Sequence, residues 1–559
     1  MSNLLPRATV NLILKVARSL AVSLSIAVSV LPVPSQVQEN PGRASGDASA
    51  RSPAALDRLR ADIEAVIGQA DFTRAEWGVK VISLATEKVL YAHNPEKYFS
   101  PASNAKLFTA ALALNNLGPD FKIETSLYAA RAPDENGTLD GDLVVYGRGD
   151  PDFRAGLHSG DYRAALEPLA AALVKSGVKR INGDLIGDQS YFSGPPYGSG
   201  WEWDDFQWYY GAEVSALSIN DNSLDLWVKP GPHVGAPARI ETGPSTSLIT
   251  LMNRTTTVSP GGKRHIGVYR PVGENVIYVS GSMPAGDSGY VGYVAVHDPA
   301  LLFVSMLRDV LSAHGVTVSG RTRSVDWKYR DVAPLDKDKI KCLGSVLSRP
   351  LREIIKDTLK RSQNLYAQLL LLQVGARARD DKMSSDSGNA QPQARSSNPV
   401  SPQSALALQE DESDRTTEQY GLEAMKSFLQ SITPPASQLI QEGSGLAYRN
   451  EVSPESIVSL LQYMSHHKYG DVFRDSLPVA GLDGTLQNRM KGTAASGNLR
   501  AKTGTLAHVV TLSGYVTSVA GEPLAFSILL NGVAPGPGNS GREAVDKVAV
   551  LLASFTGHS

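Results

Sequence analysis

Two residues one helical turn apart, Ser103 and Lys106, have side chains that could carry out nucleophilic chemistry. They lie in the stretch YFSPASNAKLFTAALALNNLG, which begins at Tyr98. The spacing of its apolar residues predicts a helix that Ser100 caps and Gly118 ends. Both side chains would lie on one face near the helix N-terminus, where the macrodipole favours negative charge on the serine oxygen. A lysine with a lowered pKa can take the proton of a serine and so turn it into a nucleophile.

The same two residues also have an ordinary explanation, a capping serine beside a lysine at the surface. The motif alone favours it, because the S-x-x-K spacing recurs at Ser176–Lys179 and Ser465–Lys468. Two further motifs distinguish the first copy. Ser362-Gln363-Asn364 enters an amphipathic helix, and Lys502-Thr503-Gly504 lies on a predicted strand. This ordered set of three motifs is typical of penicillin-binding proteins and serine β-lactamases.

Each residue of the first two motifs has a predicted chemical role. Ser103 attacks a peptide carbonyl and becomes acylated, while Lys106 accepts its proton. Ser362 relays a proton to the leaving amine, and Asn364 hydrogen-bonds the amides of the substrate. Backbone N–H groups of Ser103 and Thr505 would form the oxyanion hole.

The third motif suits the terminal carboxylate of a substrate. Lys502 adds positive charge and raises the cost of a second ammonium group nearby. Thr503 and Thr505 offer hydroxyl groups to the carboxylate. Gly504 would let a substrate approach the strand closely, because it has no side chain. These residues together predict recognition of a peptide that ends in a carboxylate.

The long gap between Lys106 and Ser362, with its β-rich texture, narrows the resemblance. The layout resembles the class C low-molecular-mass penicillin-binding proteins, the D-alanyl-D-alanine carboxypeptidase/endopeptidases of peptidase family S13. Further stretches are similar to that family: PASNAKLFT, GRGDPDF, GWEWDDFQWYYGAEVSALSINDNS, GSGLAYRNEVSP and LPVAGLDGTLQNRM. The sequence departs from the family at Gln363 (usually Asp), at Leu359 (commonly Asn) and at Arg449, which is displaced by about one position.

The resemblance implies an α/β fold in which a β-lactamase/transpeptidase-like domain is interrupted by two nested β-rich domains. It implies a serine D,D-peptidase that cleaves D-Ala-D-Ala termini, D,D cross-links or both in peptidoglycan stem peptides. Penicillin and other β-lactams would acylate the same serine, and no cofactor or metal is implied. An acidic residue, Asp205 or Asp204, and Arg449 would hold the amino and carboxylate groups of a diaminopimelate side chain.

Composition along the chain predicts how these parts are organised. The N-terminal segment, first positive and then apolar, predicts a signal peptide and export to the periplasm. An uncleaved segment would instead keep the protein associated with the inner membrane. The C-terminal part reads as two strands, 499–518 and 523–533, before a closing helix. The predicted segments are the signal at 1–35, a flexible leader at 36–53, the transpeptidase-like domain at 54–125 and 296–559, inserted domains at 126–295, and a disordered Ser- and Pro-rich insertion at 377–416.

The overall composition excludes several classes of function. The 559 residues carry a formal net charge of -2, so the basic excess of a nucleic-acid-binding protein is missing. The ten histidines show none of the spacings that bind zinc. The single cysteine, Cys342, excludes an internal disulfide, and we expect it to be a small buried or half-buried apolar residue.

Two other functions remain as alternatives to the peptidase. A serine β-lactamase would need a dedicated means of deacylation, which no motif supplies. A non-catalytic protein that binds wall peptides would not need the complete set of motif residues. The sequence leaves open the preference for carboxypeptidase or endopeptidase action, the oligomeric state and any protein partners.

Overall fold

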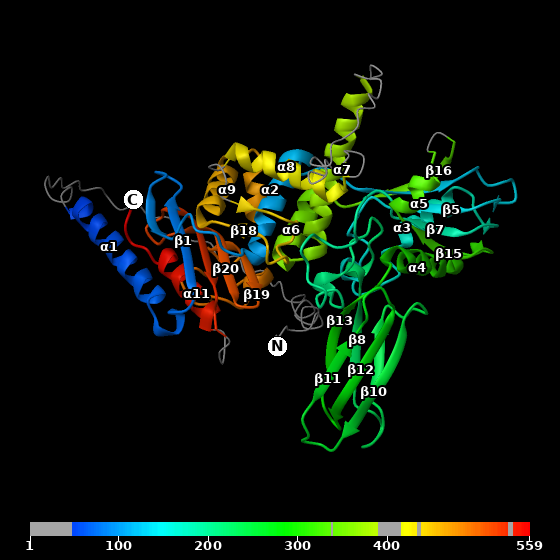
Figure 1. Cartoon of the computed structure of the whole chain (residues 1–559), viewed down its shortest axis with the longest axis horizontal. Coiled ribbons are helices and arrows are strands. Elements are labelled where there is room, and N and C mark those ends of the chain that lie inside the picture. The colour runs from blue at the N-terminus through cyan, green and yellow to red at the C-terminus, as the bar shows by residue number, and fades with distance from the viewer. Residues whose placement is uncertain (1–46, 337–338, 389–414, 433–437, 535–539) are drawn as a thin grey trace, which may run out of the picture.

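The computed structural model describes residues 47–336, 339–388, 415–432, 438–534 and 540–559. Figure 1 shows one body built from the two ends of the chain and a second body built from its middle, drawn cyan to green. The predicted signal peptide lies outside the described residues. The predicted leader is wrong in its last part, because helix α1 (Asp47–Ile67) begins inside it.

Five antiparallel strands form the central sheet of the first body, in the order β19-β20-β21-β1-β2. The segment 499–518, predicted as one strand, is a hairpin of two strands that turns at His508, where φ is 61°. The segment predicted around residue 525 is a single strand. The strands are β1 (Glu76–Ser83), β2 (Val89–His93), β19 (Arg500–Leu506), β20 (Val509–Thr517) and β21 (Pro523–Asn531).

Both faces of the central sheet are covered by helices. Side chains of a strand point alternately to opposite faces, and on β21 both sets are apolar. Phe526 and Ile528 pack with α1 and with α11 (Ser540–Ala553), whereas Ala525 and Leu529 pack with the helices of the other face. The alternation therefore produces two cores separated by one sheet.

The second helical layer contains α2 (Ala105–Leu117), whose first ten residues are all buried. It is surrounded by α6 (Leu351–Arg361), α7 (Asn364–Gly388), α8 (Thr417–Ile432), α9 (Pro454–His466) and α10 (Gly470–Asp475), with the two-stranded β17 (Gln438–Leu439) and β18 (Glu451–Val452) nearby. Helix α7 corrects the predicted insertion at 377–416, because its helical backbone continues to Gly388. The remaining predicted disorder, over 389–414, lies outside the described residues.

The middle of the chain forms a five-stranded mixed sheet, in the order β15-β7-β5-β3-β16. Three helices and a small three-stranded parallel sheet accompany it. The strands of the large sheet are β3 (Glu124–Ala129), β5 (Leu143–Tyr146), β7 (Leu185–Asp188), β15 (Thr322–Val325) and β16 (Lys341–Leu347). The other elements are α3 (Glu167–Lys175), α4 (Pro299–Ala313), α5 (Trp327–Val332), β4 (Thr138–Leu139), β6 (Arg180–Ile181) and β14 (Thr317–Val318).

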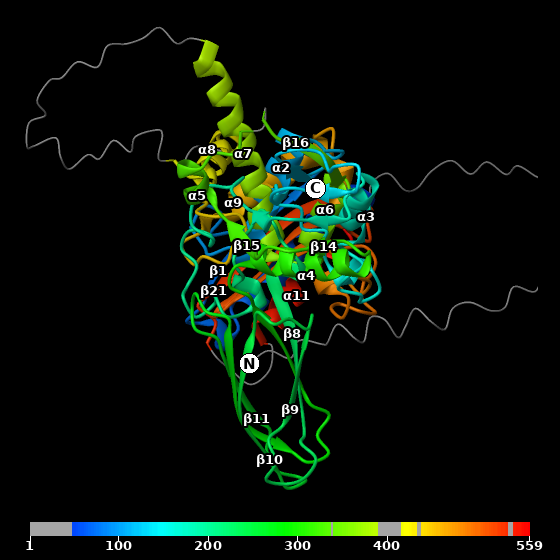
Figure 2. The same cartoon turned by 90° about the vertical axis from the view of Figure 1, so that its right-hand side faces the viewer.

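Two three-stranded sheets, nested within this region, project away from the rest of the molecule (Figures 1 and 2). Their strand orders are β13-β8-β9 and β10-β12-β11. The strands are β8 (Ser223–Lys229), β9 (Arg239–Gly243), β10 (Thr250–Val258), β11 (His265–Tyr269), β12 (Val276–Pro284) and β13 (Tyr290–Ala295).

The predicted end of the inserted region at residue 295 is wrong. Strands β15 and β16 come after it but complete the mixed sheet, and α4 packs its apolar side into the core of that sheet. The reason is that the pattern of apolar residues in α4 shows that one face of the helix is buried, but does not show against which core that face packs. The strand pairing extends the inserted region to about residue 347.

Two further findings concern membrane and redox chemistry. Within the described residues, no helix combines the length and the apolar character that crossing a bilayer requires. Cys342 is exposed, which corrects the predicted buried or half-buried position. The cause is its place near the start of β16, an edge strand whose first two residues are both exposed.

Helices α7 and α8 approach each other through facing glycines, and this contact generates a stability prediction. A Cβ added to Gly375 would lie 2.0 Å from the carbonyl oxygen of Thr417, and one added to Gly421 would lie 2.6 Å from that of Leu371. Because backbone cannot move aside cheaply, Gly375→Ala should destabilise the protein by about 1–3 kcal/mol. Thermal unfolding measures this effect. The control Ser427→Ala, at an exposed position of α8, should leave the melting temperature nearly unchanged, and equal melting temperatures for both variants would contradict the proposed close contact.

Candidate active site

The turn that carries Ser103 differs from the predicted helix start. A 3-10 turn, η4 (Ala102–Asn104), precedes α2, and Ala102 has a positive φ of 46°. Ser100 makes no helix cap, since its buried hydroxyl has no hydrogen-bond partner among the described residues. The predicted stop at Gly118 is confirmed by its φ of 79° at the end of α2.

Contacts with the central sheet and with a neighbouring loop hold this turn in place. Thr511 Oγ1 donates to the carbonyl of Pro101 at 2.9 Å, and Asn104 Nδ2 donates to Ser513 Oγ at 2.7 Å. A Cβ added to Gly504 would lie 2.7 Å from the same Pro101 oxygen. Gly504 is thus required for the packing of β19 against the turn that carries Ser103, and its role in admitting the substrate stays a prediction.

Lys106 is fully buried and links three parts of the chain. Its Nζ donates to Ser103 Oγ at 2.9 Å, to Asn364 Oδ1 at 2.6 Å and to the carbonyl of Ser444 at 2.5 Å. Burial lowers the pKa of Lys106 to about 7, although the charge of Glu442 acts in the opposite direction. The lysine can therefore lose its proton near neutral pH and act as a base beside Ser103.

Ser362 and Lys502 form a second serine–lysine pair. Ser362 ends α6 in a left-handed conformation, with φ of 57°, and its Oγ accepts a hydrogen bond from Lys502 Nζ at 2.8 Å. The Nζ atom also donates to the carbonyl of Thr503 at 2.8 Å. Burial, and next the charge of Lys106, hold the pKa of Lys502 well below its usual range. Two ammonium groups are thus disfavoured in this site, as the sequence predicts.

The threonines of the third motif lie on β19, at an edge of the central sheet. Thr503 is buried, and its Oγ1 donates to Thr485 Oγ1 at 2.8 Å. Thr505 is exposed. Thr485 belongs to the 3-10 turn η9 (Gly484–Leu486), which packs against α6 and β19. Strand β19 pairs with β20 on one side, and on its other side a bridge between Val479 and Arg500 covers its first residues.

The acidic stretch around Asp205 belongs to the inserted region and reaches the site through Tyr210. The side chain of Tyr210 hydrogen-bonds Asp205, and its backbone carbonyl accepts a hydrogen bond from Asn364 Nδ2 at 2.8 Å. Burial raises the pKa of Asp205 to about 6, with further contributions from Asp204 and Glu202. Desolvated and surrounded by like charge, this carboxylate favours a positive partner.

Arg449 is exposed and forms no ion pair with Asp204 or Asp205 in the part of the chain that the structure describes. It lies beside the same stretch, since a Cβ added to Gly200 would be 3.8 Å from Arg449 Cδ. The structure therefore brings Arg449 near the acidic stretch and does not join the charges directly.

Sequence reasoning missed three contributors to the site. Glu442 is fully buried and accepts hydrogen bonds from the backbone N–H groups of Ser444 and Gly445, both at 2.6 Å. It thereby fixes the carbonyl of Ser444 against Lys106. The other two are the Tyr210 carbonyl and Thr485. Glu442 stands directly before the GSGLAYRN stretch, and this position in the sequence could have identified it. A contribution made by a backbone carbonyl, as at Tyr210, has no sequence pattern that could reveal it.

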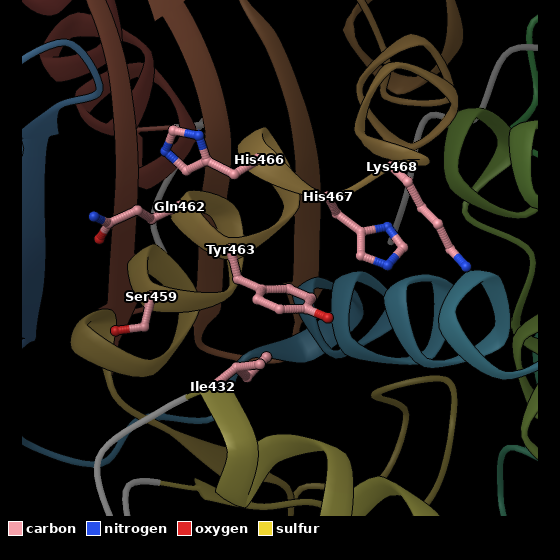
Figure 3. Close-up of a pocket in the computed structure, with 7 residues that line it drawn as sticks. All are labelled: Ile432, Ser459, Gln462, Tyr463, His466, His467 and Lys468. Atoms are coloured by element: carbon pink, nitrogen blue, oxygen red, sulfur yellow. The ribbon is translucent and has the colours of Figure 1, made fainter.

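The third S-x-x-K copy, Ser465–Lys468, has an ordinary structural role. Ser465 Oγ donates to the Gln462 carbonyl of its own helix at 2.7 Å, and Lys468 Nζ lies 4.9 Å from the ring centroid of Tyr469. Lys468 is one of the residues that line a cavity of about 610 Å³, formed by the end of α8, by α9 and by the turn after α9 (Figure 3). No cluster of three potential metal ligands occurs among the described residues.

The chain is similar to several known proteins. The model of the D-Ala-D-Ala carboxypeptidase 3 (S13) family matches residues 59–398 and 393–553. A D-alanyl-D-alanine carboxypeptidase of Actinomadura sp. (strain R39) is 32% identical over 524 residues, which cover 91% of this chain and 86% of that protein. The D-alanyl-D-alanine carboxypeptidase DacB of Haemophilus influenzae is 26% identical over 453 residues, covering 80% and 84%. The crystal structure of penicillin binding protein 4 (dacB) from Haemophilus influenzae matches with a TM-score of 0.68 and 25% identity, covering 87% of this chain and 97% of that chain.

A serine and a buried lysine on one turn, facing a second serine and a second lysine, define a penicillin-recognising serine acyl-transfer enzyme. The chain belongs to the D-Ala-D-Ala carboxypeptidase 3 (S13) family, which confirms the family predicted from its motifs. The predicted α/β transpeptidase-like fold with inserted β-rich domains is also confirmed.

The pKa of Lys106 generates a prediction about pH. A base must be neutral, and a pKa lowered to about 7 means that Lys106 loses its proton as the pH rises through that value. The rate constant for acylation by a fluorescent penicillin should therefore rise roughly tenfold per unit well below about pH 7 and level off above about pH 8. Intrinsic fluorescence over the same range serves as the folding control. A flat profile in a folded protein would mean that another group is the base.

Proposed function

We propose that this protein is a serine D,D-peptidase whose acyl-enzyme forms on Ser103, with peptidoglycan stem peptides as substrates. The observation that carries the assignment of residues is the 2.9 Å hydrogen bond between Lys106 Nζ and Ser103 Oγ in a fully buried lysine. A lysine at the surface would keep its proton at neutral pH, whereas burial makes this one available as a base.

In the proposed acylation step, Ser103 Oγ attacks the carbonyl carbon of the D-Ala–D-Ala bond and Lys106 takes the serine proton. The oxygen of the tetrahedral intermediate would be stabilised by the backbone N–H groups of Ser103 and Thr505. The C–N bond then breaks, and the proton passes through the Ser362 hydroxyl to the leaving amine. An ester on Ser103 remains and Lys106 is neutral again.

Water completes the reaction by attacking this ester. Lys106 takes a proton from the water and returns it to Ser103 Oγ, so the peptide carboxylate is released and the enzyme is restored. A free D-alanine leaving group makes the reaction a carboxypeptidase step, and a cross-linking side chain makes it an endopeptidase step. A β-lactam reacts by the same first step, because its ring amide is opened by the serine.

Recognition of the substrate carboxylate is assigned to Lys502, Thr503 and Thr505. Burial disfavours the ammonium form of Lys502 in the free site. A bound carboxylate would favour that form again, because an opposite charge raises the pKa of a lysine. Substrate binding and the charge of Lys502 are therefore coupled in this proposal.

The acidic stretch suggests how the peptide side chain is selected. Asp205, with Asp204 beside it, would bind the ammonium group of a diaminopimelate residue, and Arg449 would bind its carboxylate. Support comes from the like charges around Asp205 and from its link through Tyr210 to Asn364. We further propose a location in the periplasm, where such peptides occur; association with the inner membrane stays a prediction.

The proposed nucleophile is tested by Ser103→Ala. Covalent labelling by fluorescent penicillin and peptide cleavage should both be abolished, because no other residue is expected to form the ester. The melting temperature should hardly change. The control Ser465→Ala, in the third S-x-x-K copy, should label like the wild type.

The labelling experiment also separates the alternatives. A covalent adduct on Ser103→Ala would show that another serine reacts. Rapid loss of the label from the wild-type protein would indicate a β-lactamase, and no labelling at all would indicate a binding protein.

Side-chain selection is tested by Asp205→Asn and Arg449→Ala. A charged hydrogen bond contributes roughly 1.5–3 kcal/mol, so each change should lower kcat/KM for a diaminopimelate peptide about tenfold or more. Penicillin acylation, and cleavage of a peptide with an uncharged side chain at that position, should change much less. The control Glu241→Gln removes an exposed acid of the projecting sheets and should have no effect. Equal losses on all substrates would refute selection of the side chain.

A further inference from the structure

A buried carboxylate of the inserted region lies against the helix joint that carries Ser362. Asp221, only 3% exposed, accepts a hydrogen bond from Arg361 Nη2 at Oδ2 and one from the Tyr366 hydroxyl at Oδ1, both at 2.6 Å. Arg361 Nη1 also donates to the Tyr366 hydroxyl at 3.3 Å, and its guanidinium lies 5.5 Å from the ring centroid. Asp221, Arg361 and Tyr366 therefore form a closed triangle of contacts.

The position of the two partners along the chain explains what this triangle constrains. Arg361 is the last residue of α6 and Tyr366 is in the first turn of α7. Between them, Ser362 adopts a left-handed backbone and Asn364 begins α7. The carboxylate thus connects the end of one helix to the start of the next, across the two residues that bind Lys502 and Lys106.

The turn that presents Asp221 is itself held in an unusual conformation. In η7 (Asn220–Asn222), three consecutive residues other than glycine have positive φ, of 48°, 57° and 52°. Asn222 stabilises the turn, because its Oδ1 accepts from the Ile219 N–H at 3.0 Å and its Nδ2 donates to the Glu213 carbonyl at 2.7 Å. Backbone conformations of this kind persist only where the surroundings determine them, and they cluster at functional sites.

We propose that Asp221 is a positioning residue for acylation, which fixes Ser362 and Asn364 relative to the two lysines by binding Arg361 and Tyr366 together. The two donors reach different oxygens of the carboxylate, and an asparagine would replace one of these oxygens with an NH2 group, which donates and cannot accept. Through this contact the inserted region shapes the chemistry as well as the substrate site. The inference rests on the proposed role of Ser362.

The test measures acylation of the full chain by a fluorescent penicillin in a stopped-flow instrument, which separates the acylation rate constant from the affinity of the non-covalent complex. Asp221→Asn should lower the rate constant at least about tenfold, because small displacements of reacting groups are costly. The non-covalent affinity should stay within about twofold. Tyr366→Phe, which removes one donor, should also slow acylation and should not add to Asp221→Asn in the double variant.

The matched control is Asp188→Asn. Asp188 is also a fully buried carboxylate of the inserted region that binds an arginine, with Arg330 Nε 2.7 Å from its Oδ2, but it lies on β7 away from the joint. The Asp188→Asn variant should have a lower melting temperature than the wild type and an unchanged rate constant for acylation. The proposal would be overturned if a folded Asp221→Asn variant were acylated with the wild-type rate constant. It would also be overturned if Asp188→Asn lowered that rate constant as much as Asp221→Asn does. If Asp221→Asn does not fold, the acylation rate constant of Tyr366→Phe decides: a lowered value supports the proposal and the wild-type value overturns it.

The variant Ser362→Ala is measured in the same experiment, so that the proposed role of Ser362 and the positioning role of Asp221 can be rejected independently. Slow acylation by Ser362→Ala with normal acylation by Asp221→Asn would reject only the positioning role. Wild-type acylation by Ser362→Ala would reject the proposed role of Ser362 and this inference with it.

Discussion

The burial of one amino group determines how the rest of the site is built. Lys106 Nζ is sealed from solvent and satisfied by oxygens from its own turn, from α7 and from the loop after Glu442. A buried ammonium group without such partners would cost several kcal/mol. The three acceptor oxygens offset part of the free-energy cost of burying the ammonium group. Because they do not offset all of it, the pKa of Lys106 stays low enough for the lysine to act as a base.

Two of these acceptors depend on other parts of the fold. Asn364 is oriented by the Tyr210 carbonyl of the inserted region, and Ser444 by the buried carboxylate of Glu442. A shared core, in which Trp201 and Val214 of the insertion pack with Leu365 and Leu369 of α7, joins the two bodies at the start of the helix that carries Asn364. The insertion is therefore part of the scaffold that aligns the acyl-transfer groups.

Local chemistry could be predicted from the sequence, and distant contacts could not. Ser103 and Lys106 share a helical turn, so their proximity follows from spacing alone. Tyr210 acts through its backbone carbonyl, and Asp221 acts through residues 140 and 145 positions away, so neither has a local pattern. The boundary at residue 295 was misplaced because the amphipathic pattern of α4 predicts that the helix packs against a sheet, but does not identify which sheet.

The central sheet joins strands from opposite ends of the chain, since β1 pairs with β21 and Trp77 lies opposite Leu530. Lys502 reaches Ser362 only when β19 has joined that sheet. A chain in which β19 has not yet joined the sheet would therefore display Ser103 without the Ser362–Lys502 pair. Covalent labelling by a β-lactam would thus report that the two ends of the chain have joined in one sheet.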